Sequence, residues 1–223
     1  AGAWPEITWQ VLPAAQGVVQ QEGAAAALAR LKDYNALLIR PGLTAAGTAA
    51  AFLKDLLDGL DKEAWQGRVV LDADALNLLA RMPDWARLLP AGCVLTPHPG
   101  EMSRLTGVSI SDINQRRIAT ARRFAAEWGQ VVLLKGPHTV IAHPDGRTIV
   151  LPFADPALAK AGSGDVLAGA ILAMLGQGLE QFQAASAGAY VHGLSGLMMG
   201  RALGAASVTA RDLIQGISPA LQQ

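Results

Sequence analysis

The feature that most constrains the fold is an alternation of short apolar runs with longer helical patterns. The runs at 36–40, 68–72, 93–97 and 131–135 lack strict alternation of apolar and polar residues. Such runs are typical of strands that are buried on both faces. Segments with helical spacing lie between and after them, at 16–33, 45–60, 111–128, 164–176, 180–201 and 209–216. This order predicts an α/β fold with a mainly parallel central sheet and helices on both faces.

Two segments depart from this pattern. Residues 138–152 alternate around the turn sequence His143-Pro-Asp-Gly146, which predicts an antiparallel hairpin at the end of the sheet. Residues 7–13 predict a further strand close to the amino end. We find no domain boundary, so residues 1–223 are expected to form one domain whose chain starts in the middle of a fold.

Composition excludes several classes of protein. Eighteen basic residues balance eighteen acidic ones, so no surplus charge favours nucleic acid or an acidic membrane surface. Residues 181–200 carry no formal charge, but glutamine, serine and histidine interrupt them. They therefore predict a buried helix more strongly than a membrane span. The single cysteine, Cys93, fits the reducing cytoplasm, and we expect the protein there.

Polar or glycine-containing segments follow each of the four predicted parallel strands. Their carboxyl ends meet at one edge of the sheet, which is where open α/β sheets bind ligands. Four such segments at one edge therefore indicate a site. They are Arg40 to Leu43, Asp72 to Asn77, Thr96 to Glu101 and Lys135 to Thr139.

The strongest local motif is Ala161-Gly-Ser-Gly-Asp165, directly before a helical run. Small residues at a helix start let backbone N–H groups face an anion, and the helix dipole adds attraction. Asp165 could accept a proton from a hydroxyl group that attacks a phosphoryl group. Alternatively, Asp165 only complements the helix dipole. Neither a Walker loop nor a GxGxxG fingerprint is present.

The other candidates also allow two interpretations. Lys135 could hold a phosphate with help from Thr139, or it could simply reach solvent at a strand end. Glu101 could hold a water of a Mg²⁺ ion, or act as a dipole partner at a helix start. Asp72, Asp74 and Asn77 could line a polar site or cap helices. His143 is expected in a solvated turn and His192 in the core, because the histidines lack zinc-site spacing.

Five segments in this order resemble the NAD(P)H-hydrate dehydratase family: VLDADALNLL, LTPHPGEMSRLTG, VVLLKGPHTVIA, AGSGDVLAGAI and VTARDLI. The resemblance implies a three-layer ribokinase-like fold. It also implies Mg²⁺-dependent dehydration of the S epimer of NADH or NADPH hydrate, which restores the cofactor. Bacterial members typically use ADP and eukaryotic ones ATP. Phosphorylation of the hydrate's hydroxyl group would turn a poor leaving group into a good one.

Residue roles follow from the same resemblance. Asp165 matches the catalytic base and a hydrate contact, and Gly42 and His98 match hydrate-binding positions. Glu101 is where related sugar kinases have an acidic residue that organises Mg²⁺, with Asp72 and Asn77 as further polar lining. No direct protein ligand to the metal is expected. The nucleotide-binding positions are Lys135, Gly136, Pro137, His138, Thr139 and Gly164.

The chain departs from the family pattern in two places. Arg40 and Thr44 replace family glycines around Gly42. The resemblance also leads us to expect that this domain lacks the family's first strand, glycine-rich turn and helix, and that it lacks the preceding epimerase domain that many bacterial members carry. An epimerase domain or protein and a second copy of the chain are the expected partners.

Two other functions remain open. A ribokinase-like kinase acting on a small molecule such as a vitamin precursor would use the same aspartate and anion hole. A homologue without activity that only binds nucleotide would also fit.

Overall fold

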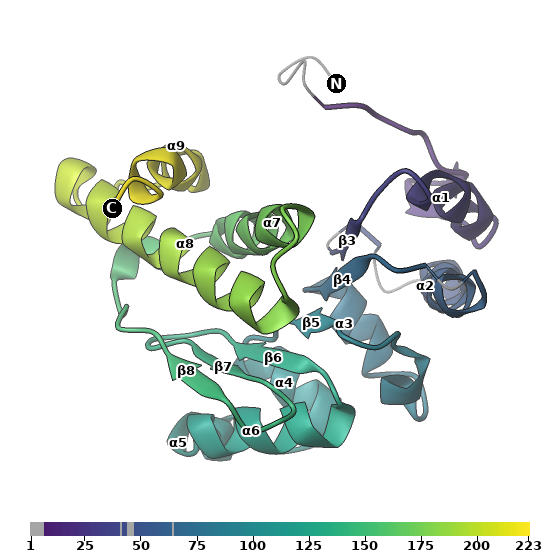
Figure 1. The fold of residues 1–223 in the computed structure, drawn as a ribbon, viewed down its shortest axis with the longest axis horizontal. Helices are drawn as coiled ribbons and strands as arrows, with labels where there is room; N and C mark the ends of the chain where they lie inside the picture. The colour runs from purple at the N-terminus through teal and green to yellow at the C-terminus, as the bar shows by residue number, and fades with distance from the viewer. Residues whose placement is uncertain (1–6, 41, 44–46, 64) are drawn as a thin grey trace.

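The computed structural model describes residues 7–40, 42–43, 47–63 and 65–223. A six-stranded sheet lies at its centre, in the order β3-β4-β5-β6-β7-β8. The first four of these strands are parallel, and β7 and β8 add an antiparallel hairpin. The mainly parallel sheet and the hairpin are thus confirmed (Figure 1). The strands are β3 (Ala36–Ile39), β4 (Arg68–Leu71), β5 (Val94–Leu95), β6 (Val131–Leu134), β7 (Val140–Ala142) and β8 (Thr148–Val150).

Helices cover both faces of the sheet, as expected (Figure 1). One face carries α1 (Gly23–Leu31), α2 (Gly47–Lys62), α3 (Asp74–Leu79), α4 (Pro99–Thr106), α5 (Ile110–Gln115) and α6 (Arg117–Trp128). The other carries α7 (Ser163–Gly176) and α8 (Gln181–Leu203), with α9 (Ala210–Ala220) packed against them. Two 3₁₀ turns, Trp85–Leu88 and Pro156–Leu158, complete the elements.

Successive residues of each central strand enter different cores, because side chains alternate across a sheet. Leu71 and Leu95 pack on the side of α1–α3, and Val70 and Val94 pack on the side of α7 and α8. In β6, Leu133 faces α7 and α8, whereas Val132 and Leu134 face α4–α6. Both faces are apolar, which explains why these runs show no alternation in the sequence.

The amino-terminal expectations are wrong in detail. Residues 7–13 form no strand, and Val11 there is 94% exposed, so the segment lacks the burial that its apolar residues suggested. A short hairpin follows, β1 (Ala14–Ala15) with β2 (Val18–Val19), and its turn has positive φ at Gln16 and Gly17. The helix expected over 16–33 therefore begins only at Gly23.

The helical segment expected over 111–128 is two helices. The backbone breaks at Arg116, which has φ −128° and ψ 39°. Ser109 caps the first of them, because its side chain accepts a hydrogen bond from the Asp112 N–H at 3.1 Å. Thr209 caps α9, and the Asp212 carboxylate accepts a hydrogen bond from the Thr209 N–H.

The helices α3 and α4 lie where polar segments after strands were expected, with helix starts as the alternative interpretation. Each begins a few residues after its strand and is short, so its apolar residues give little periodic signal.

Within the described residues, no helix is long and apolar enough to span a bilayer.

The long helix α8 packs closely against α7. A Cβ atom on Gly188 would lie 2.8 Å from the Ile171 backbone nitrogen and 2.9 Å from its Cα. Gly188 thus allows the backbones of the two helices to touch.

We predict that Gly188→Ala lowers the free energy of unfolding by about 1–3 kcal/mol, because the Ile171 backbone cannot move aside. Urea unfolding measures this. The control is Gly169→Ala in α7, whose Cβ position has no described heavy atom within 4 Å. It should raise stability by up to about 1 kcal/mol through helix propensity. Equal effects of the two substitutions would contradict the close contact.

Candidate active site

Four polar side chains form a row at the carboxyl edge of the sheet. Arg40, Asp72, Thr96 and Lys135 each follow the last residue of a strand, and those last residues pack toward α1–α6. Because side chains alternate, the next residue in each strand turns toward the face that α7 covers. We call these four residues the carboxyl-edge row.

Backbone hydrogen bonds hold the row together beyond the ends of the strands. The Asp72 N–H donates to the Ile39 carbonyl at 3.0 Å, and the Thr96 N–H donates to the Leu71 carbonyl at 3.1 Å. The Lys135 N–H donates to the Pro97 carbonyl at 2.9 Å. The polar segments expected to share one edge are therefore side by side.

Lys135 does not simply reach solvent. Its Nζ lies 2.6 Å from Asp72 Oδ1 and 3.6 Å from Glu101 Oε2. Thr96 Oγ1 also donates to Asp72 Oδ1 at 2.8 Å. The carboxylates of Asp72 and Glu101 are both buried, so the lysine charge has compensating partners and a fixed position.

His98 and Glu101 form the start of α4. His98 Nδ1 accepts hydrogen bonds from the N–H groups of Gly100 and Glu101, so the ring proton of the neutral histidine is on Nε2. Nε2 lies 3.3 Å from Glu101 Oε1, and Glu101 Oε2 accepts from the His98 N–H at 2.8 Å. Burial lowers the pKa of His98, opposed by Glu101, while Lys135 lowers it further. A neutral ring is thereby favoured near pH 7.

Gly42 and Asn77 contact other parts of the same edge. Gly42 has φ +109°, and its N–H donates to Asp74 Oδ2 at 3.1 Å, which ties its loop to the start of α3. Asn77 accepts a hydrogen bond from Arg104 Nη1 at 2.9 Å, which links α3 to α4. Thr44 lies outside the described residues.

The amino terminus of α7 meets the row from the opposite face. Gly162 adopts φ +82° before the helix, and Ser163, Gly164 and Asp165 form its first turn. A Cβ atom on Gly164 would lie 3.8 Å from Lys135 Nζ. Arg40 Nη2 forms an ion pair with Asp165 Oδ1, and about half of the Asp165 side chain stays exposed. The amino terminus of α7 thus lies between two cations, Arg40 and Lys135.

A largely apolar cavity of about 430 Å³ opens beside this helix terminus. Its polar end holds Lys135, Gly136, Thr139 and Gly164, and Pro137 also lines it. His138 is absent from the lining residues; it has φ +51°, and its Nδ1 lies 3.2 Å from the Leu151 carbonyl. The apolar wall is built from Leu151, Phe153, Pro156, Leu158, Leu167, Ala189 and Gly193.

Three features of this cavity were not found from the sequence. Residues 151–159 supply much of its wall, and only the fold brings them next to α7 and α8. Arg117 supports the start of the loop at residues 135–139, donating to the Leu134 carbonyl at 2.9 Å and the Lys135 carbonyl at 3.2 Å. His192 lines the cavity while remaining the buried, hydrogen-bonded residue that the sequence predicts.

His192 and Ser163 form a buried pair at the cavity. Their Nε2 and Oγ atoms lie 3.1 Å apart. Burial lowers the pKa of His192 to about 4, although a hydrogen bond to the Ser163 backbone acts in the opposite direction. A neutral imidazole therefore joins α8 to the first turn of α7.

The donor set fits a Mg²⁺ ion held chiefly by phosphates and water. Three carboxylates, Asp72, Glu101 and Asp165, face two cations, Arg40 and Lys135. A polyphosphate entering this site would need further positive charge. In the described part of the chain, no group of three His, Cys, Asp or Glu side chains is arranged to hold a metal directly.

Comparison with known proteins decides the family. A model of the family described as NAD(P)H-hydrate dehydratase matches residues 3–219. The chain belongs to the NAD(P)H-hydrate dehydratase family. The fold is ribokinase-like, since a ribokinase of Arabidopsis thaliana superposes with TM-score 0.52 at 15% identity over 92% of this chain and 61% of its own.

Relatives of this dehydratase family match most of the chain. A bifunctional NAD(P)H-hydrate repair enzyme of Moorella thermoacetica is 41% identical over 89% of this chain and 36% of its own length. An ADP-dependent (S)-NAD(P)H-hydrate dehydratase of Neisseria meningitidis is 43% identical over 74% of this chain and 55% of its own length. This chain therefore spans roughly a third to just over half of these two relatives.

A solved structure of the family is also similar. The ADP/ATP-dependent NAD(P)H-hydrate dehydratase of Bacillus subtilis, co-crystallised with ATP and Mg²⁺, has a TM-score of 0.76 and 31% identity. The match covers 90% of this chain and 69% of that one.

We predict that His192 makes the protein less stable as the pH falls from about 6.5 toward 4. The unfolded histidine takes up its proton near pH 6.5, whereas the folded one resists protonation until about pH 4. The loss should reach about 2 kcal/mol by pH 5. Urea unfolding at several pH values measures it. His192→Gln should remove this part of the pH dependence and His143→Gln should retain it; an unchanged slope in His192→Gln would contradict the assignment.

Proposed function

We propose that this chain dehydrates the S epimer of NADH or NADPH hydrate at the expense of ADP. The observation that carries the proposal is the position of Asp165, half exposed in the first turn of α7 and directly after Gly164, which lies near Lys135 and lines the apolar cavity. The site would thereby combine a proton acceptor, an anion-binding helix terminus and a fixed cation beside a cavity that has space for a nucleotide. Family membership supports the same chemistry.

The cavity supports the placement of the nucleotide. Its apolar wall, which includes Phe153, Leu158 and Leu167, suits a base and a sugar. Its polar end leads to Gly164 and Lys135, where the N–H groups of α7 and the lysine charge attract phosphate oxygens. The segment Lys135–Thr139 would border the phosphates, with Arg117 holding its carbonyls from behind.

The hydrate would approach from the side of Gly42 and His98. The neutral His98 ring is held by the start of α4, and Gly42 is held by Asp74. Both residues lie at the same edge as Asp165. A ring hydroxyl group placed there could donate to the Asp165 carboxylate while facing the terminal phosphoryl group.

The reaction then proceeds in two steps, phosphoryl transfer followed by elimination of phosphate. Asp165 accepts the hydroxyl proton as the hydrate oxygen attacks the β-phosphorus of ADP; the bond to the bridging oxygen breaks, and AMP leaves with that electron pair. In the second step the C–O bond breaks and phosphate leaves with its electrons. Loss of a proton from the adjacent ring carbon forms the double bond of NAD(P)H.

Mg²⁺ is the expected metal of this reaction. When bound, it would neutralise phosphate charge, with Glu101 and Asp72 holding its waters as the nearest buried carboxylates. Glu101 also fixes the start of α4 through its hydrogen bond to the His98 N–H.

Several finer points are part of the proposal. We expect a homo-oligomer in the cytoplasm and an epimerase, joined or separate, that supplies the S epimer. ADP is the favoured donor because the Neisseria meningitidis relative is described as ADP-dependent. A small-molecule kinase is the alternative activity.

We predict that NADH hydrate, ADP and Mg²⁺ incubated with the protein regain the absorbance of NADH. AMP and phosphate should form in equal amounts with the recovered cofactor. A phosphorylated product that accumulates without recovery of NADH would support the kinase alternative. Nucleotide binding without any turnover would support the binding-only alternative.

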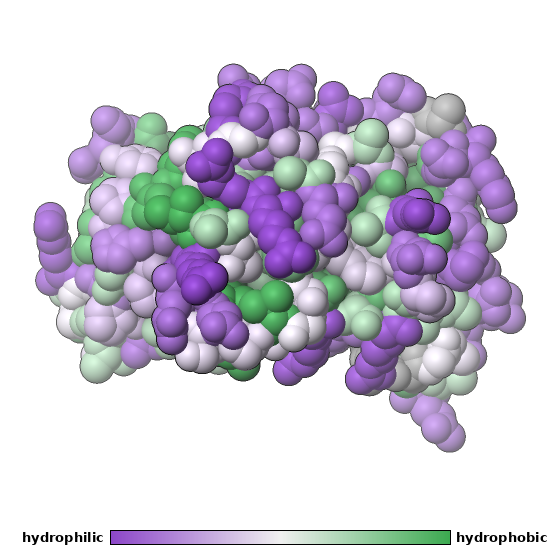
Figure 2. Space-filling model, turned by 90° about the horizontal axis from the view of Figure 1, so that it is seen from below, coloured by the Kyte–Doolittle hydropathy of each residue, from purple (hydrophilic) through white to green (hydrophobic). Residues whose placement is uncertain are grey.

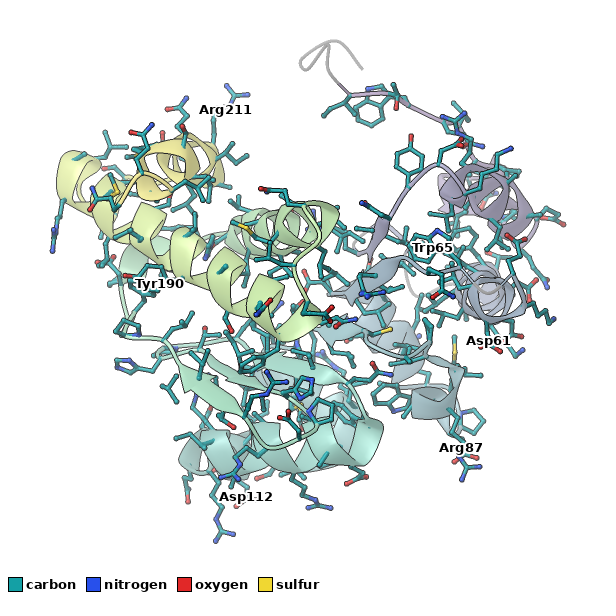
Figure 3. The ribbon with its side chains drawn as sticks, in the orientation of Figure 1. Asp61, Trp65, Arg87, Asp112, Tyr190 and Arg211 are labelled. Atoms are coloured by element: carbon teal, nitrogen blue, oxygen red, sulfur yellow. The ribbon has the colours of Figure 1, made fainter. Side chains whose placement is uncertain are left out.

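We predict that Asp165→Asn lowers kcat by about a hundredfold or more, because the amide cannot accept the hydroxyl proton. Affinity for ADP, measured by calorimetry, should change little. Asp112→Asn is the matched control, because Asp112 is also a first-turn acid but lies on α5, far from α7 (Figure 3). Full turnover in Asp165→Asn would exclude Asp165 as the base.

A further inference from the structure

We infer that Arg40 binds the phosphoryl group that is transferred, so that Arg40 and Lys135 hold this group from two sides of the α7 terminus. The inference rests on the proposed function and adds a phosphoryl-binding residue to it.

The first support is the placement of Arg40. It follows β3 in the carboxyl-edge row, and its side chain turns toward α7 because Ile39 packs toward α1–α3. Its Nη2 reaches Asp165 in the first turn of α7. Lys135 lies at the same turn, near Gly164. A phosphoryl group at the helix terminus would therefore have a cation on each side.

The second support is an unsatisfied donor. The Arg40 side chain is only 25% exposed, and its buried Nε has no hydrogen-bond partner among the described residues. A buried donor without a partner costs free energy, which a ligand oxygen would recover. The planar guanidinium presents several donors in a fork that matches phosphate oxygens. Burial lowers the pKa of Arg40, and the Asp72 carboxylate opposes this, so a nearby acid favours the charged form.

The ion pair with Asp165 gives the arginine two states. Without a nucleotide, Arg40 neutralises the carboxylate that would act as the base. An incoming phosphoryl group competes for the guanidinium with its own negative charge. When Arg40 moves to that group, Asp165 is left free to accept the hydroxyl proton, and the arginine stabilises the charge on the phosphoryl oxygens.

This proposal is tested by comparing ADP with AMP, because only ADP carries the group that is transferred. Calorimetry at constant Mg²⁺ gives both affinities for the wild-type chain, Arg40→Gln and Arg40→Lys. We expect Arg40→Gln to weaken ADP binding about tenfold or more while AMP binding changes less than twofold. Arg40→Lys keeps the charge but loses the fork, so its loss should be intermediate.

The matched control is Arg68→Gln. Arg68 begins β4 at the opposite end of the neighbouring strand, where its Nη1 donates to the Gln66 carbonyl at 2.9 Å. It should leave both affinities unchanged. Thermal unfolding of each variant identifies any loss of fold, and Arg40→Lys supplies the comparison if Arg40→Gln does not fold.

The outcomes separate this inference from the proposed function. An unchanged ADP-to-AMP affinity ratio in the Arg40 variants overturns the inference, whether both affinities stay the same or both fall by the same factor. An Arg40-dependent ratio without hydrate turnover supports the inference while rejecting the proposed function. If the wild-type chain binds neither nucleotide, both are overturned.

Discussion

Burial of the central strands on both faces is the constraint on which the other features depend. A strand that is buried on both faces can carry polar side chains only beyond its buried residues. In this sheet all four parallel strands end with an apolar residue that faces α1–α6, so the next residue always faces α7. The carboxyl-edge row is therefore a consequence of strand register. Polar side chains gather there because the parallel strands are apolar from their second residue to their last.

The buried Asp72–Lys135 pair fixes the charge pattern of the site. A lysine at the end of a strand would otherwise be a mobile side chain in solvent. Here the lysine pairs with the carboxylates of Asp72 and Glu101, and the Thr96 hydroxyl donates to Asp72. The lysine side chain is 17% exposed. The cost of desolvating these groups is offset by their mutual attraction and hydrogen bonds. The face of the molecule seen in Figure 2 differs, with hydrophilic residues interspersed with hydrophobic patches.

The parallel strands could be predicted from the sequence because short, doubly buried runs have a distinct composition. The strands in turn predicted which edge of the sheet carries the candidate site. The glycine-rich start of α7 was found separately, from its local sequence motif. Residues 7–13 misled the prediction, because an apolar composition indicates a strand only where a neighbouring strand can pair with it. Helix starts were considered at α3 and α4, but their ranges were not predicted, because six to eight residues hold too little periodicity. The wall at residues 151–159 and the role of Arg117 depend on tertiary contacts that no local pattern records.

The contact at Gly188 joins the two ends of the cavity. The helix α7 carries the proposed anion-binding terminus, and α8 supplies part of the apolar wall, at Ala189 and Gly193. Because Gly188 lets the two backbones approach closely, the separation of this terminus from that wall depends on a single glycine. A side chain at this position would push the two helices apart and would therefore shift the two ends of the cavity relative to each other.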